Sequence, residues 1–310
     1  MEELLHNYTN LNNSFKKKLV FNIGTEAGFF SEYNYMILAM LYCLDNKIKF
    51  TLFSKNANFR YKNGWTDYFL PFCEENRDNF HIKHNFRWTR YIYRRERPPY
   101  ILYKWLRNVD YFTFDIWEQI RDRHLENKQY TIPELGINGD IQDACRVLID
   151  LTWKYNSYTQ ERVDKLVSSV SLPQDYIGLQ IRSGDKFVEA ELLGVSAYID
   201  KLQSISDLQD VFILTDDYRI IETLQNNYPF LRIKTLCEEH ERGYFHQKFE
   251  KEDRNIIKNA HERLFASMDI LSRSQKFIGT FSANPGMYLG MRMPKGSALS
   301  IDIDKWQIWL

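Results

Sequence analysis

The chain has 310 residues, of which 41 are Lys or Arg and 41 are Asp or Glu, so its formal net charge is zero. This balance argues against a dedicated nucleic-acid coat protein or polybasic membrane binder, but is compatible with a local charged patch. Hydrophobic residues make up 44% and charged residues 26%, as in a globular chain of about two domains and not a disordered one. Aromatic residues reach 15%, which suits stacking against sugars or bases and a bulky core equally well.

The sequence carries no signal for export or membrane insertion. No stretch has the length and lack of charge of a membrane span, and the polar N-terminus lacks the apolar segment of a secretory signal. The four cysteines are scattered: Cys43, Cys73, Cys145 and Cys237. Without CxxC spacing they indicate free thiols, and we predict a cytoplasmic protein. His81 and His84 lack further ligands nearby in sequence, so we predict no metal site.

The N-terminal region predicts a strand, a helix and a second strand. Lys18–Ile23 is a short β-branched and aromatic run ending at Gly24, typical of a buried strand. An apolar stripe over Glu32–Leu44 predicts a helix, and the alternation in Lys47–Phe53 predicts a strand. Such a unit normally forms a right-handed parallel crossover.

The segment Asn58–Trp117 has no clear periodicity and is punctuated by Pro98–Pro99. Within Arg87–Arg107, seven cationic side chains alternate with six aromatic ones. They could form an acceptor groove, with rings against sugar faces and cations against hydroxyls or phosphates. The alternative is a partly buried, aromatic-rich segment whose Arg and Lys side chains extend along apolar surface to reach solvent. It explains the pattern equally well. On the first interpretation, the acceptor-binding residues are Trp65, Trp88, Arg94 and Arg95.

Helices and strands alternate regularly in the C-terminal half, as in a parallel, doubly wound sheet. Asp140 is a plausible N-cap for the first helix. The predicted helices are Asp140–Lys154, Thr159–Val170, Ser196–Ser204, Asp217–Asn226, Asn255–Ser272 and Ser282–Met291. The predicted strands are Tyr176–Arg182, Val211–Thr215, Leu231–Lys234, Lys276–Gly279 and Ala298–Asp302, and a charged loop covers Cys237–Arg254.

Three polar turns follow predicted strands, at the carboxyl edge where open parallel sheets bind ligands. The run Arg182–Lys186 (RSGDK) fits a phosphate clamp or a surface ion-pair cluster. Asp216 and Asp217 could accept hydrogen bonds from ribose or guanine, could coordinate a metal, or could simply cap a helix. Thr280–Gly286 fits an anion site at a helix start, or an ordinary capped helix. Together the three predict a nucleotide diphosphate pocket without a Walker loop or GxGxxG.

The order of these motifs resembles the fucosyltransferase superfamily, in particular the α1,6-fucosyltransferases. The carriers of this resemblance are a strand followed by RSGDK, a strand followed by TDD, and a strand followed by GTFS. Asn58–Phe72 also resembles a segment of the α1,6 type. The resemblance implies an α/β GT-B fold, with two Rossmann-like domains facing across a cleft. We expect an acceptor domain at 1–165 and a donor domain at 166–310.

The resemblance implies an inverting glycosyltransferase that moves fucose from GDP-fucose, its donor substrate, to a glycan or glycolipid hydroxyl. It implies no required cofactor or metal. Arg182 matches the arginine that neutralises the β-phosphate, Asp185 and Lys186 match an Asp-Lys pair, and Glu189 matches the proposed general base, with Glu191 as the alternative. The donor-binding positions are Tyr61, Tyr198, Asp216, Asp217, Thr280 and Ser282, together with Asp269 after a register slip of two.

Three positions depart from the family pattern: Gln180 replaces a histidine, Ser183 an arginine and Ala283 a serine. Another nucleotide sugar could therefore be the donor, or the chain could be a nucleotide- or glycan-binding module without catalysis. A polyanion binder that uses Arg87–Arg107 is a third alternative. We expect no nucleic-acid partner, and a peripheral membrane contact where lipid-linked glycans are built.

Overall fold

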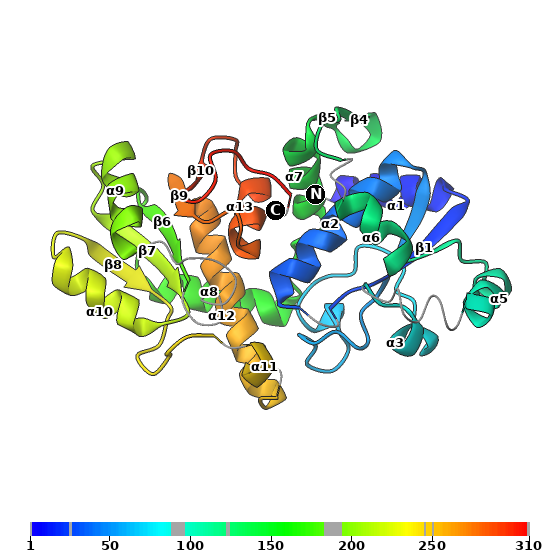
Figure 1. The fold of residues 1–310 in the computed structure, drawn as a ribbon, viewed down its shortest axis with the longest axis horizontal. Coiled ribbons are helices and arrows are strands. Elements are labelled where there is room, and N and C mark those ends of the chain that lie inside the picture. Colours follow the sequence, from blue (N-terminus) through cyan, green and yellow to red (C-terminus); the bar gives the residue numbers. More distant parts are fainter. Residues whose placement is uncertain are drawn as a thin grey trace. The chain divides into compact units, whose positions relative to one another are not determined.

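The computed structural model describes residues 2–24, 27–87, 97–121, 125–182, 194–244, 246–249 and 251–308 (Figure 1). The chain divides into two compact units, Met1–Asn156 and Ser157–Leu310, which are described separately below. The predicted domain boundary at 165–166 falls inside a helix of the second unit.

The first unit contains a three-stranded sheet, a two-stranded sheet and several helices. Its helices are α1 (Glu2–Ser14), α2 (Phe29–Asp45), η1 (Trp65–Asp67), α3 (Phe80–His84), α5 (Arg97–Arg107), α6 (Thr113–Arg121), η2 (Pro133–Leu135) and α7 (Ile141–Thr152). Its strands are β1 (Lys17–Asn22), β2 (Ile48–Phe53), β3 (Tyr111–Phe112), β4 (Tyr130–Ile132) and β5 (Ile137–Gly139).

The predicted strand–helix–strand unit is confirmed as β1–α2–β2. The larger sheet has the order β2-β1-β3 and both of its strand pairs are parallel. Helix α2 packs against both long strands and against α7, so nearly all of its residues are buried. Asp140 caps α7 as predicted, accepting hydrogen bonds from the backbone N–H groups of Gln142 and Asp143.

The polar N-terminus forms a helix that the sequence analysis did not predict. Helix α1 lies against β2, which is an edge strand of the sheet. The buried amide of Asn12 donates to the carbonyl oxygen of Phe50 at 2.9 Å and accepts from its N–H at 2.7 Å. This side chain therefore satisfies the backbone N–H and carbonyl groups of Phe50 much as a neighbouring strand would.

Many of the aromatic residues of the first unit build its core. Trp65 is 1% exposed and stacks on Phe69, with ring centroids 4.4 Å apart, and on Tyr33 at 6.1 Å. Trp153 packs edge-on against Tyr33 at 5.2 Å. These pairs show that the high aromatic content serves packing in this unit.

An ion pair is buried next to the carboxyl end of β1. Arg87 is 5% exposed and Glu32 is 2% exposed, and their charged groups are 3.3 Å apart. The second oxygen of Glu32 accepts a hydrogen bond from the N–H of Gly24, and the Arg87 guanidinium lies 4.7 Å from the centre of the Trp117 ring. Arg87 thus belongs to the interior of the unit and not to an acceptor groove.

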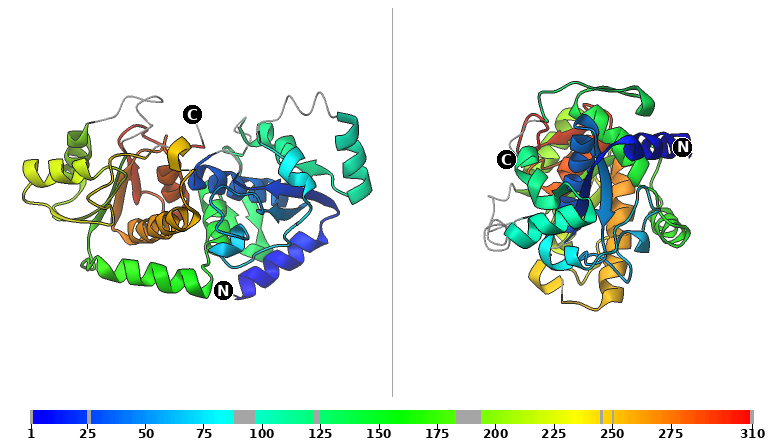
Figure 2. Two further views of the ribbon diagram at one scale, coloured as in Figure 1. Left: turned by 90° about the horizontal axis from the view of Figure 1, so that it is seen from below. Right: turned by 90° about the vertical axis from the view of Figure 1, so that its right-hand side faces the viewer.

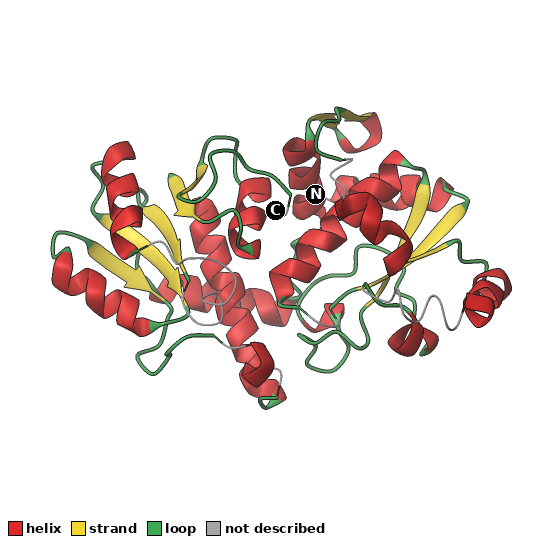
Figure 3. Cartoon of the chain, in the orientation of Figure 1, coloured by secondary structure: helices red, strands yellow, loops and turns green. Residues whose placement is uncertain are grey.

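The second unit contains a five-stranded sheet with helices packed against it (Figure 3). Its helices are α8 (Ser157–Ser169), α9 (Val195–Ile205), α10 (Tyr218–Asn227), α11 (His246–Phe249), α12 (Arg254–Arg273) and α13 (Asn284–Arg292). Its strands are β6 (Ile177–Ile181), β7 (Asp210–Thr215), β8 (Arg232–Thr235), β9 (Lys276–Gly279) and β10 (Ala298–Ser300). These elements agree with the prediction apart from α11, which lies in the predicted loop, and small shifts at the ends.

All four strand pairs are parallel, in the order β10-β9-β6-β7-β8. In chain order, β7 and β8 are added on one side of β6, and β9 and β10 are then added on its other side. Right-handed crossovers therefore place α9 and α10 on one face and α12 and α13 on the other (Figure 1). Helix α8 lies alongside α12 (Figure 2).

The central strand β6 separates two different environments. Ile177, Leu179 and Ile181 belong to the apolar cluster shared with α9 and α10. Gly178 faces the other side, where a Cβ atom would lie 2.7 Å from Leu271 of α12. Alternation along the strand turns Gln180 toward this second face as well.

Removing the carboxylate of the buried ion pair should strongly destabilise the first unit. We expect Glu32→Gln to lower the free energy of unfolding by about 3–5 kcal/mol, because Arg87 would keep its buried charge without this carboxylate. The matched control is Asp45→Asn, which breaks the more exposed 2.7 Å pair with Lys128 and should cost at most about 1 kcal/mol. Urea unfolding measures both, and equal losses would contradict the assignment.

Acidification should weaken the same unit through His81, which is fully buried among Asn22, Asn85 and Tyr103. Burial lowers the pKa of His81 to about 4, below its ordinary value of 6.5. The unfolded chain therefore binds the proton more readily, and stability is lost as the pH falls from about 6.5 toward 4. The loss amounts to about 3 kcal/mol.

Urea unfolding at several pH values checks this. His81→Leu should flatten the decrease in stability below pH 6.5, whatever its effect at neutral pH. His6→Leu, on the exposed side of α1, should leave the pH dependence unchanged. An identical pH profile in wild type and His81→Leu would show that another group is responsible.

Candidate functional site at the carboxyl edge of the second sheet

The strand order brings the ends of the three strands that precede the predicted polar turns to one edge of the five-stranded sheet. Strand β6 lies between β7 and β9, and the three strands are parallel. Arg182 therefore follows the central strand, Asp216 follows one neighbour and Thr280 follows the other. Open parallel sheets bind their ligands at such an edge, close to the point where the strand order reverses.

Arg182 is half-buried directly beyond the last residue of β6. Four other residues of the predicted catalytic segment, Asp185, Lys186, Glu189 and Glu191, lie outside the described residues. The predicted acceptor residues Trp88, Arg94 and Arg95 also lie outside them.

Gln180 presents an unsatisfied acceptor beneath this edge. Its side chain is 1% exposed, and its Oε1 atom has no hydrogen-bond partner among the described residues. Cβ atoms added to Gly279 and Gly286 would lie 3.1 and 3.3 Å from this oxygen. A buried polar atom without a partner is costly, so this oxygen is suited to accept a hydrogen bond from a bound ligand.

Helix α13 begins beside Gln180 without a side-chain cap. Its N-cap residue is Ala283, and Pro285 occupies the first turn. A Cβ atom on Gly286 would collide with the carbonyl oxygen of Thr280, so this end of the helix lies directly against the end of β9. The positive end of the helix dipole therefore points toward the carboxyl edge.

The loop between β9 and α13 is held by a carboxylate that the sequence analysis did not identify. Exposed Asp302 accepts hydrogen bonds from the N–H groups of Phe281 at 3.0 Å and Ser282 at 3.2 Å. It also accepts from the hydroxyls of Ser282, at 2.5 Å, and Ser300. The predicted anion site at these N–H groups is thus occupied by a carboxylate of the chain itself.

The two aspartates after β7 have different partners. Asp217 caps α10 through the N–H of Arg219 and pairs with that residue's guanidinium at 2.5 Å. Asp216 instead accepts a hydrogen bond from the backbone N–H of Tyr244 at 3.0 Å. Of the interpretations open for this pair, helix capping describes Asp217, while Asp216 fixes the loop that follows β8.

Two other predicted donor residues lie within the second unit. Tyr198 on α9 is 4% exposed, and burial, reinforced by the charge of Asp302, raises the pKa of its hydroxyl. Asp269 on α12 is buried and forms an ion pair with Arg292 at 2.7 Å, which ties α12 to α13. The Asp269 carboxylate therefore has a structural partner in this structure.

In the first unit, Tyr61 is half-buried at the start of a tight loop. The Asp67 carboxylate accepts hydrogen bonds from the N–H groups of residues 61–64, which fixes this loop. Trp65 lies in the core with its indole N–H donating to the carbonyl oxygen of Leu70 at 3.0 Å. Its two stacking partners cover the ring, so Trp65 does not present the acceptor surface that was predicted.

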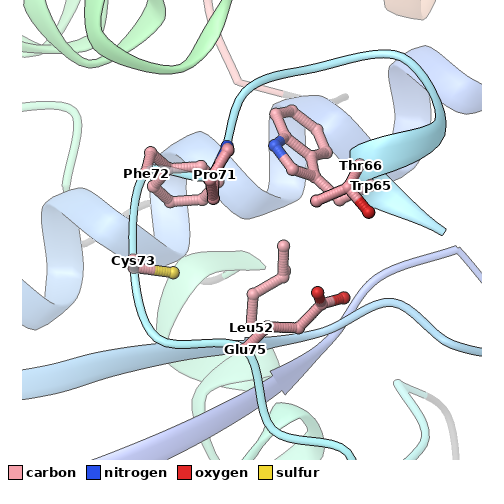
Figure 4. Close-up of a pocket in the computed structure, with 7 residues that line it drawn as sticks. All are labelled: Leu52, Trp65, Thr66, Pro71, Phe72, Cys73 and Glu75. Atoms are coloured by element: carbon pink, nitrogen blue, oxygen red, sulfur yellow. The ribbon is translucent and has the colours of Figure 1, made fainter. Parts of the chain in front are cut away.

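A small pocket lies next to Trp65 (Figure 4). Its empty volume is about 190 Å³ including space open to solvent, whereas sites for drug-sized ligands typically measure about 300–1,000 Å³. A nucleotide sugar does not fit this space. The pocket is lined by Leu52, Trp65, Thr66, Pro71, Phe72, Cys73 and Glu75.

Three further properties of the described residues bear on the chemistry. They contain no cluster of three or more His, Cys, Asp or Glu side chains that could hold a metal ion. The helices that the structure describes include none long and apolar enough to cross a membrane. All four cysteines are free thiols.

Comparison with known proteins shows a likeness in structure. No protein-family model and no curated protein matches the chain. Fucosyltransferase NodZ from Bradyrhizobium matches with a TM-score of 0.55 and 12% identity, over 90% of this chain and 94% of that chain. NodZ α-1,6-fucosyltransferase soaked with GDP-fucose gives the same TM-score and identity, over 90% and 93%. Apo POFUT1 gives a TM-score of 0.48 and 14% identity, over 93% and 98%.

The likeness to NodZ confirms the predicted α/β fold of GT-B type. The chain has the mixed α/β fold of GT-B fucosyltransferases, with parallel sheets, and the resemblance to the α1,6 type holds at the level of the fold. At 12% identity the likeness extends to the fold alone.

The close approach of α13 to β9 predicts that Gly286 tolerates no side chain. Gly286→Ala should lower the free energy of unfolding by about 1–3 kcal/mol, because the methyl group overlaps a backbone carbonyl. The control is Gly194→Ala at the start of α9, where the new methyl group meets nothing closer than 3.6 Å. Thermal unfolding compares the two, and an unaffected Gly286→Ala protein would contradict the described packing.

Proposed function

We propose that this chain is an inverting glycosyltransferase that moves fucose from GDP-fucose to a glycan or glycolipid hydroxyl. The observation that carries the proposal is the convergence of Arg182, the unsatisfied Gln180 oxygen and the uncapped start of α13 at one sheet edge. Support comes from the fold, which is shared with a NodZ enzyme that was soaked with GDP-fucose.

In the proposed reaction, the acceptor oxygen attacks C1 of the sugar as the bond from C1 to the diphosphate breaks. Arg182 would neutralise the charge that develops on the departing diphosphate, with each charge-assisted hydrogen bond contributing about 1.5–3 kcal/mol. The dipole of α13 adds positive potential at the same edge. Lys186 and Asp185 would support the arginine. Glu189, or Glu191 in its place, would take the acceptor proton.

The remaining predicted donor residues would surround the nucleotide. Within the second unit we assign Tyr198, Asp216, Asp217, Asp269, Thr280 and Ser282 to this group. Tyr61 of the first unit stays a prediction from the resemblance. Asp217 and Asp269 already hold the ends of α10 and α13, so their contribution would be to fix the walls of the site. No metal or cofactor is needed in this scheme, because the cationic groups and the helix dipole would provide the positive charge.

The carboxylate of Asp302 favours a second candidate function. The N–H groups of Phe281 and Ser282 can receive a phosphate only after Asp302 leaves them. A chain in which Asp302 stays in place could bind a nucleotide or glycan without catalysing transfer, or could accept a different nucleotide sugar.

The activity test compares two arginines at opposite edges of the same sheet. Arg182→Ala should lower kcat/KM for fucosyl transfer by about 100- to 1,000-fold, because one preorganised charge contact to the leaving group is lost. Arg232→Ala removes an exposed arginine that pairs with Asp210 at the amino edge, and should leave kcat/KM unchanged. Mass spectrometry of the glycan and assay of released GDP report the reaction.

A thermal-shift panel of nucleotide sugars precedes the kinetics and ranks the donors, because a bound ligand raises the melting temperature. Stabilisation by GDP-fucose without GDP release in the presence of glycans would favour the binding module. If only another nucleotide sugar stabilises the protein, that sugar and not GDP-fucose would be assigned as the donor. Wild-type turnover in a folded Arg182→Ala protein would refute the role of this arginine.

A further inference from the structure

The loop between β9 and α13 binds an anion that belongs to the chain itself. The carboxylate of Asp302 accepts hydrogen bonds from the backbone N–H groups of Phe281, at 3.0 Å, and Ser282, at 3.2 Å. The hydroxyls of Ser282 and Ser300 donate to the same carboxylate. These donors converge just before α13 begins at Asn284, and such a donor set at a helix start is typical of phosphate-binding loops.

The Gln180 side chain independently marks the same place as a ligand site. Its Oε1 atom lies close to Gly279 and Gly286, the glycines on either side of this loop. The side chain is 1% exposed, and this oxygen accepts no hydrogen bond from the described residues. The loop donors therefore have an acceptor within the chain, whereas the buried acceptor beside them lacks a donor. A ligand that carries both phosphate oxygens and hydroxyl groups can satisfy both.

Asp302 can leave these donors without unfolding its surroundings. Its side chain is exposed, so the carboxylate can rotate into water without burying its charge. The backbone on either side is held in place. Strand β10 pairs with β9 up to Ser300, and the indole N–H of Trp306 donates to the carbonyl oxygen of Met287 on α13 at 2.8 Å. The carboxylate is therefore a displaceable group on a fixed support.

We propose that Asp302 is an internal competitor for the diphosphate group of the ligand that binds at this edge. Because the carboxylate is tethered next to the loop, its effective concentration there is high, and an incoming diphosphate has to displace it. Affinity for diphosphate is thereby lowered, and the carboxylate returns to the N–H groups when a diphosphate product leaves. That this diphosphate is part of a sugar donor rests on the proposed function, whereas the competition itself does not.

The alternative is a structural role, in which Asp302 only stabilises the loop. The two roles predict opposite effects on ligand binding. Removal of a structural carboxylate would loosen the loop and weaken the binding of a diphosphate. Removal of a competitor frees the N–H groups of Phe281 and Ser282, takes away a negative charge that repels the ligand, and strengthens binding.

Isothermal titration calorimetry of the full chain with inorganic diphosphate distinguishes these roles. We expect Asp302→Asn to bind inorganic diphosphate about tenfold or more tightly than the wild type, because the competing charge is lost while an amide oxygen can still support the loop. Asp302→Ala, which leaves no acceptor, should also bind more tightly. The matched control is Asp304→Asn, which removes an exposed negative charge two residues further along the chain and should bind as the wild type does.

Circular dichroism and melting temperature report whether each variant is folded. The gain in affinity must appear in each Asp302 variant that folds, and failure of both to fold would show a structural role and overturn the proposal. Unchanged or weaker binding in a folded Asp302 variant, an equal gain in Asp304→Asn, or no diphosphate binding by any of the proteins would overturn it as well. Fucosyl transfer is assayed separately. If transfer from GDP-fucose is absent while Asp302→Asn gains affinity for diphosphate, the proposed function fails and the competition stands.

Discussion

Parallel hydrogen bonding of β6 on both sides is the constraint on which the candidate site depends. Because β7 and β9 both run parallel to β6, the chain leaves all three strands at the same edge. The edge collects Arg182, Asp216 and Thr280, residues far apart in the sequence. Had one of these strands been antiparallel, its polar turn would have left from the opposite edge.

The packing of helices against the second sheet adds two polar groups near this edge, the Gln180 side chain and the start of α13. Residues on one face of β6 contribute to an apolar cluster, whereas Gly178 and Gln180 face α12 and α13. Glycine at 178 allows α12 to approach closely, and the close packing of Gly286 brings the start of α13 over Gln180. The unsatisfied oxygen and the uncapped helix end therefore arise from the same close packing.

The sequence predicted the regular parts of the fold because short buried strands and amphipathic helices leave strong periodic patterns. The β1–α2–β2 unit, the five-stranded parallel sheet and the cap at Asp140 were recognised in this way, whereas β3, β4 and β5 were not predicted. Helix α1 was missed because its polar sequence has little apolar periodicity, and its anchor is a single buried asparagine. The acceptor contact predicted for Trp65 failed because composition cannot distinguish a ring that faces a ligand from one that stacks on other rings.

Asp302 was missed for a different reason. Its role depends on the pairing of β10 with β9, which sets the residues after both strands side by side, and strand order is not visible in a single sequence. The signal that could have revealed it is the run Ser300–Asp302 at the end of a predicted strand. Asp216 and Asp217 show the same limit, since adjacent identical residues acquire different partners only once the loop after β8 is in place.

The contact between Asn12 and β2 also has a consequence for solubility. An uncovered edge strand offers unpaired amide and carbonyl groups to any other extended chain, which is a common route into intermolecular β-sheet aggregates. The Asn12 side chain occupies both polar groups of Phe50, and the body of α1 lies against the strand. The first helix therefore shields the part of this edge around Phe50 from pairing with extended strands of neighbouring molecules, while the segment 74–76 pairs with the strand at Leu52.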